Sequence, residues 1–289
     1  MRFGIAPIGW ANDDIRAWGS HYSGDRIMDE IAACGYQGSE RSYTYPEDPG
    51  RLREELAQRG LELCGAYRWT NLADSARHAE ELALARAHVD YCAAAGARHA
   101  IVAEGVGSLH WDFRGPRDRV VPLDEPGWAR LTEGLRHLAA YASDRGVTLG
   151  YHAHAGTAVE RRPEIDELLH RVEELAFCLD TAQLALAGED PEEAARDYAD
   201  RIPYAHLKDV RPRVLDRVHL DRPRFLDAVR WNVFCTPGQG GLDFRAILPH
   251  LRRAEWLVVE ADQDPAQNPP LEVASRALSF LKEVLACPA

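Results

Sequence analysis

Eight short apolar segments recur along the chain, separated by longer amphipathic stretches, and this alternation constrains the fold more than any other feature. Each segment is nearly continuously apolar, which is typical of a parallel strand that is buried on both faces. The segments are 3–8, 36–40, 61–67, 99–104, 147–152, 175–180, 202–207 and 256–260. They predict eight parallel strands.

The stretches between these segments have the pattern of helices. Apolar residues recur at helical spacing over residues 74–95. Asp190 and Pro191 mark a helix start, because Asp accepts hydrogen bonds from free amides and Pro fits the first turn. Gly60 supplies the left-handed conformation that ends a helix. Eight strand–helix repeats in 289 residues predict a (β/α)8 TIM barrel, an α/β fold, in a single domain over residues 1–289.

An open, doubly wound sheet is the alternative fold. No Gly-x-Gly-x-x-Gly motif and no P-loop follows an early strand segment, which disfavours it. The segment 211–237 follows the seventh strand and is predicted to be long and partly irregular. Long loops on a barrel usually serve the active site.

The composition excludes several kinds of partner. The formal net charge is -12 and the pI is near 5.5, so we expect neither nucleic acid nor an anionic membrane surface to bind. No apolar run approaches the ~20 residues of a membrane span, and the N-terminus has no signal-peptide pattern. The six cysteines form no Cys-x-x-Cys pair, which predicts reduced thiols in a cytoplasmic protein.

Polar residues end most of the predicted strands, and in barrels the chemistry lies at these C-terminal ends. Carboxylates and imidazoles buried side by side need a cation to neutralise them. A set of nitrogen and oxygen donors suits Mn²⁺, Co²⁺, Fe²⁺, Zn²⁺ or Mg²⁺, and the absence of thiolates argues against a structural zinc site. Of these ions we expect Mn²⁺ or Co²⁺. For Asp180 alone, a helix cap is an equal alternative. The strand-end residues are Glu40, Glu104, His152, His154, Asp180, His206, Lys208, Asp209, Glu260 and Asp262.

Three segments that contain strand-end residues resemble the xylose isomerase-like family of sugar isomerases, epimerases and related lyases. They are Asp-Thr-Ala-Gln at 180–183, His-Leu-Lys-Asp-Val-Arg at 206–211 and Val-Val-Glu at 258–260. The resemblance implies a barrel that holds a metal at the ends of strands five to eight. By that resemblance Asp180, His206 and Glu260 are metal ligands. His152 stands where most of the family has Glu, and is the implied fourth ligand.

Within that family, four stretches resemble the inosose dehydratases, which dehydrate 2-keto-myo-inositol. The stretches are 6–14, 102–104, 151–157 and 258–265, so the resemblance spans nearly the whole chain. One position departs from the family, because Gln183 stands where a His is usual. Glutamine can form hydrogen bonds but cannot act as an acid or base near pH 7.

A dehydratase needs a base for the proton next to the ketone and an acid for the leaving hydroxyl. The expected base is Glu260 or Glu104, and the expected acid is Lys208, His154 or His152. A metal would stabilise the enediolate as a Lewis acid. The expected substrate-binding residues are Trp10, Asn12, Asp13, Gln183 and Arg211.

Several of these residues have structural alternatives of equal weight. Lys208 could be a surface lysine paired with Asp209. Trp10 could close the barrel floor or rim. Asn12 could cap a loop, and His154 could support the site without touching a ligand.

The expected partner is a small polyhydroxylated keto compound, and a homodimer is possible for such barrels. A ketose or ketose-phosphate epimerase or isomerase is the second enzyme hypothesis. It is weakened because an epimerase needs a base on each face of the carbon, and strand five offers His152 instead of Glu. A non-catalytic sugar-binding barrel is the third hypothesis, and Gln183 is the feature that supports it.

Overall fold

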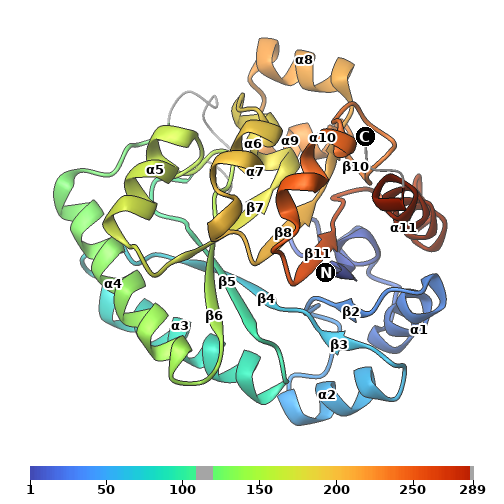
Figure 1. Ribbon diagram of the computed structural model, residues 1–289, viewed down its shortest axis with the longest axis horizontal. Coiled ribbons are helices and arrows are strands. Elements are labelled where there is room, and N and C mark those ends of the chain that lie inside the picture. The colour runs from blue at the N-terminus through green and yellow to red at the C-terminus, as the bar shows by residue number, and fades with distance from the viewer. Residues whose placement is uncertain (109–119, 287–289) are drawn as a thin grey trace.

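The structure, a computed structural model, describes residues 1–108 and 120–286. Nine parallel strands form one sheet in the order β3-β2-β1-β11-β8-β7-β6-β5-β4. Its strands are β1 (Arg2–Ile5), β2 (Gly38–Ser39), β3 (Glu62–Leu63), β4 (Ala66–Thr70), β5 (His99–Glu104), β6 (Thr148–His152), β7 (Ala176–Asp180), β8 (Tyr204–Leu207) and β11 (Trp256–Val259). The edge strands β3 and β4 follow each other in the chain, so the sheet curls into a nearly closed barrel (Figure 1). The predicted single-domain TIM barrel is confirmed.

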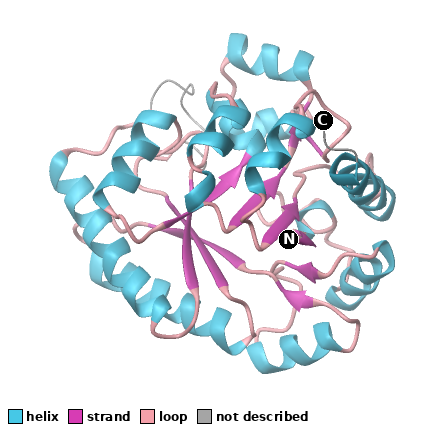
Figure 2. Cartoon of the chain, in the orientation of Figure 1, coloured by secondary structure: helices cyan, strands magenta, loops and turns pink. Residues whose placement is uncertain are grey.

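Helices surround the strands on the outside of the barrel, as Figure 2 shows. The helices are α1 (Gly24–Cys34), α2 (Pro49–Ala57), α3 (His78–Ala94), α4 (Glu125–Ser143), α5 (Arg162–Arg171), α6 (Thr181–Ala187), α7 (Pro191–Asp197), α8 (Pro212–Asp221), α9 (Phe225–Arg230), α10 (Phe244–Ile247) and α11 (Pro270–Ala286). The predicted helix start is confirmed, because the Asp190 carboxylate accepts hydrogen bonds from the Glu192 and Glu193 amides. Gly60 has the predicted left-handed conformation, with φ of 70°.

All eight predicted strand segments contain a strand, but the segment 61–67 is divided. Its first part, β3, pairs with β2, and its second part, β4, pairs with β5. Gly65 lies at the break, where a Cβ atom would be only 3.1 Å from both the His99 carbonyl and the Tyr204 hydroxyl. A glycine therefore lets the chain pass close to its neighbours where the barrel closes.

The segment 211–237 is partly regular. It contains α8, α9 and β10 (Phe234–Cys235), which pairs antiparallel with β9 (Asp209–Val210). The segment is long and partly irregular, as predicted, but the sequence did not indicate these regular elements within it. The helix α9 has six residues and the strand β10 has two, so neither is long enough to produce a clear periodicity in the sequence.

Strand periodicity decides which side chains face the inside of the barrel. On β8, Ala205 and Leu207 belong to the large apolar core that includes the helices, whereas Tyr204 belongs to a small cluster with Cys178 and Trp256. Because alternate residues face opposite sides, His206 and Asp180 follow Tyr204 and Cys178 on the inner side. The lower barrel is thus filled by large side chains, and polar groups occupy the next layer.

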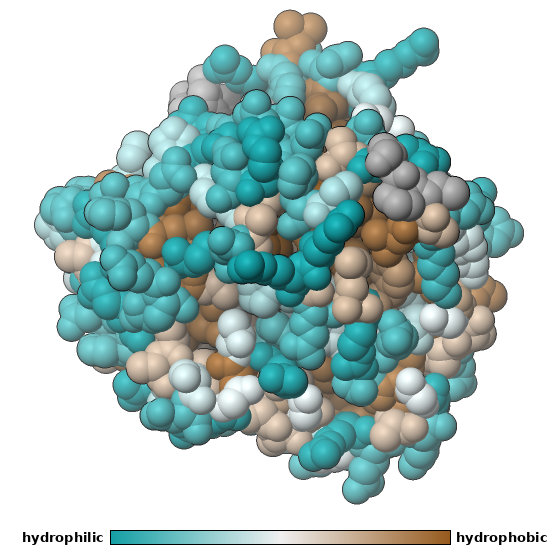
Figure 3. Space-filling model, in the orientation of Figure 1, coloured by the Kyte–Doolittle hydropathy of each residue, from teal (hydrophilic) through white to brown (hydrophobic). Residues whose placement is uncertain are grey.

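Among the described residues, no helix is both long and apolar enough to cross a membrane. The face in Figure 3 is mostly hydrophilic, with apolar side chains in the recesses. Five cysteines are free thiols, and Cys287 lies outside the described residues.

Candidate metal centre and active-site cavity

A cavity of about 450 Å³ opens at the C-terminal ends of the strands. Its lining combines imidazole, carboxylate, guanidinium and aromatic side chains. The lining residues include Asp13, Asp14, Arg16, Glu40, Arg41, Tyr67, Arg68, Trp69, His152, His154, Gln183, His206, Phe225, Glu260 and Asp262. The cavity is therefore polar at its base and partly aromatic along its walls.

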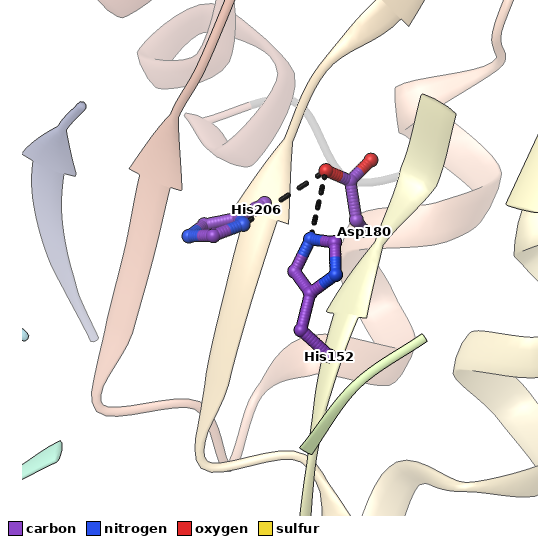
Figure 4. A group of neighbouring side chains, drawn as sticks. All are labelled: His152, Asp180 and His206. Carbon is purple, nitrogen blue, oxygen red and sulfur yellow. Dashed lines mark ion pairs between the residues drawn. The ribbon is translucent and has the colours of Figure 1, made fainter. Parts of the chain in front are cut away.

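Three buried side chains from neighbouring strands converge at the base of this cavity. One ligand atom each from His152, Asp180 and His206 can be chosen so that all three lie within 4.8 Å of one another. His152 Nε2 is 3.4 Å from Asp180 Oδ2, and His206 Nδ1 is 3.8 Å from the same oxygen (Figure 4). The register pairs Asp180 with His206 across β7 and β8, which brings these two strand ends together.

Asp180 uses its two oxygens for different tasks. Oδ1 accepts hydrogen bonds of 2.8 Å from the Ala182 and Gln183 amides at the start of α6. Oδ2 is buried, makes no hydrogen bond to any described residue, and points toward the two imidazoles. The helix cap is therefore observed, and it leaves Oδ2 directed toward the two imidazoles.

Glu260, which follows β11, lies beside this group. Its Oε2 lies 3.0 Å from His206 Nδ1. Two atoms bound to one ion at ~2.1 Å, with bond angles between 90° and 109°, lie roughly 3.0–3.4 Å apart. The separations of 3.0, 3.4 and 3.8 Å in this cluster are therefore close to those of metal ligands. The unpartnered Asp180 oxygen and the nitrogen–oxygen donor set also fit a divalent cation.

Lys208 lies behind this cluster and is fully buried. Its Nζ contacts Glu260 Oε1, lies 2.8 Å from Asp262 Oδ2 and 3.6 Å from Asp180 Oδ2. Burial would raise the pKa of Asp180 and Glu260, but the positive charge of Lys208 outweighs it, and both pKa values are lowered. The alternative of a surface lysine is wrong.

The pairing of Lys208 with Asp209, which that alternative required, is also absent among the described contacts. The Asp209 carboxylate instead accepts hydrogen bonds from backbone amides, among them those of Gly238 and Gly240. Asp209, which directly follows Lys208, thus holds the loop that contains Gly238 and Gly240.

His154 and Gln183 form a second polar pair in the cavity wall. His154 Nδ1 lies 2.9 Å from the Ala155 carbonyl, so this nitrogen carries the proton. Gln183 Nε2 then donates to His154 Nε2 over 3.1 Å, and Gln183 Oε1 accepts from the Ala155 amide. Gln183 therefore fixes the neutral tautomer of His154.

Besides Asp180 and Lys208, four other residues predicted for the site lie outside the cavity lining. Trp10 is buried and donates to Glu30. Asn12 caps its own loop, accepting from the Asp14 and Ile15 amides. Arg211 donates to the Asn232 and Phe234 carbonyls, and Glu104 accepts from the Leu72 and Val106 amides. Burial raises the pKa of Glu104 to about 7.

Asp13 does line the cavity, as predicted. Burial raises its pKa to about 6, although Arg16, 3.7 Å away, opposes this shift. Asp262 also faces the cavity, and burial raises its pKa to about 6 against the opposing charge of Lys208.

The sequence did not indicate the aromatic wall. Tyr67 and Trp69, two residues apart on β4, have ring centroids 5.6 Å apart, and Trp69 lies 4.9 Å from His154. Phe225 of α9 also lies against His154, with ring centroids 4.8 Å apart. The period-two spacing on β4 was an available signal, whereas nothing in the sequence places α9 over the cavity.

Comparison with known proteins identifies the family. The model of the family described as "Xylose isomerase-like TIM barrel" matches residues 28–284. The chain belongs to this family. An inosose dehydratase of Geobacillus kaustophilus (strain HTA426) is 38% identical over 292 residues, covering 99% of this chain and 95% of that protein. An inosose dehydratase of Clostridium perfringens (strain 13 / Type A) is 36% identical over 289 residues, covering 98% and 97%.

Solved structures of other proteins share the fold. An L-ribulose 3-epimerase has a TM-score of 0.72 at 18% identity, covering 99% of this chain and 94% of that one. The "probable 3-DHS dehydratase AsbF" of Bacillus anthracis has a TM-score of 0.71 at 14% identity, covering 98% and 99%. At these identities the likeness concerns the barrel alone.

Proposed function

We propose that this chain is a metal-dependent lyase that dehydrates an inosose-like cyclic keto-polyol through an enediolate. The proposal depends most on the buried set His152, Asp180 and His206, whose ligand atoms lie within 4.8 Å of one another. The full-length similarity to proteins named inosose dehydratases supplies the substrate class. Polar groups at the base and aromatic rings along the wall suit a hydroxylated ring.

The proposed metal ligands are His152, Asp180, His206 and Glu260. A divalent ion held there, in our proposal Mn²⁺ or Co²⁺, supplies Lewis acidity toward the ketone of the substrate. The imidazoles and carboxylates keep their places without the ion because Lys208 neutralises part of the negative charge. The side chains are thus arranged before substrate enters, which is what electrostatic catalysis requires.

Glu260 is the proposed base. Its carboxylate lines the cavity, whereas Glu104 is turned toward backbone amides outside the lining. Glu260 takes the proton from the carbon next to the ketone, and the C–H electron pair forms the enediolate. The bond to the neighbouring hydroxyl then breaks, and that hydroxyl leaves as water after it accepts a proton.

The proposed source of the proton for the leaving hydroxyl is Lys208, which passes it through the Asp262 carboxylate. Asp262 faces the cavity, and Lys208 donates a hydrogen bond to it over 2.8 Å. Lys208 acts through Asp262 in this proposal, because its own ammonium lies behind the cavity wall. His154 is unsuited as the acid, since its Nδ1 proton is held by the Ala155 carbonyl and its Nε2 accepts from Gln183.

The epimerase hypothesis has less support from these residues. His152 directs Nε2 toward Asp180 within the proposed ligand set, and a metal-bound imidazole has no free lone pair to act as a base. The non-catalytic hypothesis also weakens, because Gln183 has a defined partner in His154 and the proposed ligand set does not depend on it. A cytoplasmic location and a homodimer stay predictions.

The test uses the full chain, stripped of metal with a chelator and reloaded with Mn²⁺ or Co²⁺. Incubation with 2-keto-myo-inositol should produce a rising ultraviolet absorbance as the conjugated product forms. Asp180→Asn is the matched inactive control, because Asn still caps α6 but removes the charge. Turnover of a ketohexose without any change on 2-keto-myo-inositol would favour the epimerase. An undiminished rate in the chelated protein would exclude the metal.

A further inference from the structure

Glu40 forms a hydrogen-bonded link from β2 to β8 across the barrel. It follows β2, its side chain is buried, and its Oε1 accepts from Tyr204 Oη over 2.6 Å and from His206 Nε2 over 2.9 Å. The strands β1 and β11 separate β2 from β8 in the sheet, so the link spans the barrel interior. The proposed mechanism does not use this carboxylate.

The contact decides which nitrogen of His206 can bind a cation. Glu40 Oε1 is an acceptor, so His206 Nε2 must carry a proton. The other nitrogen, Nδ1, faces Glu260 Oε2 at 3.0 Å and Asp180 Oδ2 at 3.8 Å. In the opposite tautomer a ring lone pair would face a carboxylate lone pair, and Nδ1 would present a proton to the metal centre.

Tyr204 determines where the carboxylate sits. Its hydroxyl donates to the same Oε1 atom that accepts from His206, and Tyr204 itself is fully buried among the side chains that fill the lower barrel. The phenol ring cannot move without disturbing that packing. The three residues therefore form a fixed chain from the barrel core to the metal centre.

We propose that Glu40 is a positioning residue that makes His206 a ligand through Nδ1, with Tyr204 holding Glu40 in place. This inference rests on the proposed metal centre. A histidine that binds a metal usually donates its other N–H to a carboxylate or carbonyl, and loss of that partner costs 10–100-fold in metal affinity or activity. Glu40 supplies such a partner from a strand that contributes no ligand of its own.

The test measures Co²⁺ affinity of the full chain by competition with a chelating dye. Glu40→Ala should weaken Co²⁺ binding by about 10–100-fold. Glu40→Gln keeps an oxygen that can accept both hydrogen bonds and loses only the charge, so its affinity should lie between those of Glu40→Ala and the unaltered chain. Tyr204→Phe should weaken binding less than Glu40→Ala. The matched control is Glu47→Gln, an exposed carboxylate at the cavity rim, which should bind as the unaltered chain does.

Two further readouts separate positioning from a general structural role. The visible spectrum of bound Co²⁺ should change in Glu40→Ala, because the imidazole no longer has a fixed orientation. Nitrogen NMR of the Zn²⁺-loaded chain should show His206 protonated at Nε2, and this proton should exchange faster in Glu40→Ala. A thermal unfolding scan confirms that each variant is folded, and Glu40→Gln tests the idea if Glu40→Ala is not.

The outcomes distinguish this inference from the proposed function. Equal Co²⁺ affinity in Glu40→Ala, Glu40→Gln and the unaltered chain would overturn the role of Glu40 and leave the dehydratase proposal intact. Weakened binding in a chain that does not dehydrate 2-keto-myo-inositol would support Glu40 and overturn the substrate assignment. An unaltered chain that binds no Co²⁺ would overturn both the metal centre and the role of Glu40.

Discussion

Gln183 and His154 stabilise each other, and the substitution that set this chain apart from its family thus has a structural explanation. Gln183→Leu would leave the Ala155 amide and His154 Nε2 without their partners. Leaving buried polar groups unsatisfied costs about 1–3 kcal/mol, so we expect the free energy of unfolding to fall by about 2 kcal/mol. Because His154 would lose one of the hydrogen bonds that orient it in the cavity wall, kcat/KM should fall at least ~10-fold.

Urea unfolding and steady-state kinetics measure the two effects of Gln183→Leu. The control is Gln58→Leu, at an exposed position after α2, which should change neither quantity appreciably. A Gln183→Leu protein as stable and as active as the unaltered chain would show that the pair has no role.

The proposed ligands were predictable because each ends an apolar strand segment. Strand periodicity turns His152, Asp180 and His206 to the inside of the barrel at one level, and the sequence alone contains that information. The positions of Trp10 and Asn12 were not predictable in the same way. They lie in the loop after β1, where the direction of a side chain depends on tertiary contacts such as that of Trp10 with Glu30.

At the scale of elements, Asp209 holds β9 and the 238–242 loop together. Its carboxylate accepts hydrogen bonds from the amides of Val210, Gly238, Gly240 and Leu242 at 2.8 to 3.1 Å. Burial raises the pKa of Asp209, yet these four donors compensate part of the cost. The arrangement fixes the chain directly after Lys208.

Asp209→Asn should destabilise this unit strongly. The amide that replaces one oxygen would turn N–H groups toward backbone N–H donors, and hydrogen bonds to a charged group contribute about 1.5–3 kcal/mol each. We expect the free energy of unfolding to fall by about 3 kcal/mol, measured by urea unfolding. Asp216→Asn, at an exposed position on α8, is the control. A loss no larger than that of the control would contradict the role of Asp209.

The elements themselves were largely predictable, and the departures have physical causes. Long parallel strands buried on both faces leave a clear apolar pattern, as the segment 99–104 does for β5. The division of the segment 61–67 has no comparable pattern in the sequence. The strand breaks at Gly65 because of atoms from distant parts of the chain that lie close to it. The short helix α9 is stabilised by burial of Phe225, a tertiary effect.

Across the whole molecule, metal binding should stabilise the fold. The proposed metal centre would join β6, β7, β8 and β11, so an ion that binds only the folded chain would shift the unfolding equilibrium. At a free Mn²⁺ concentration 100 times Kd the gain is about 2.7 kcal/mol, which corresponds to a rise in Tm of roughly 5 °C. Differential scanning calorimetry with and without chelator measures it. Asp180→Asn should show no such rise, and an equal rise there would mean that the ion binds elsewhere.

The acid side of the stability profile should depend on His88, which joins α3 to the barrel. Its Nε2 donates to the Ala66 carbonyl of β4 over 3.0 Å, and burial lowers its pKa to about 4. In the unfolded chain His88 therefore binds a proton near pH 6.5, whereas in the folded chain it binds one only near pH 4. The contribution of His88 to the free energy of unfolding is fully present above pH 6.5. It declines by up to roughly 3 kcal/mol as the pH falls toward 4.

His88→Gln isolates this contribution, because Gln can donate to the same carbonyl and does not titrate. The unaltered chain should lose stability relative to His88→Gln as the pH falls from 6.5 to 4, and the difference should be constant above 6.5. Urea unfolding at half-unit pH intervals measures the difference directly, and other titrating groups cancel because both proteins share them. A difference that stays constant down to pH 4 would mean that His88 is as easily protonated in the folded chain as in the unfolded one. Burial against β4 would then cost the imidazolium nothing, contrary to the low polarity of its surroundings.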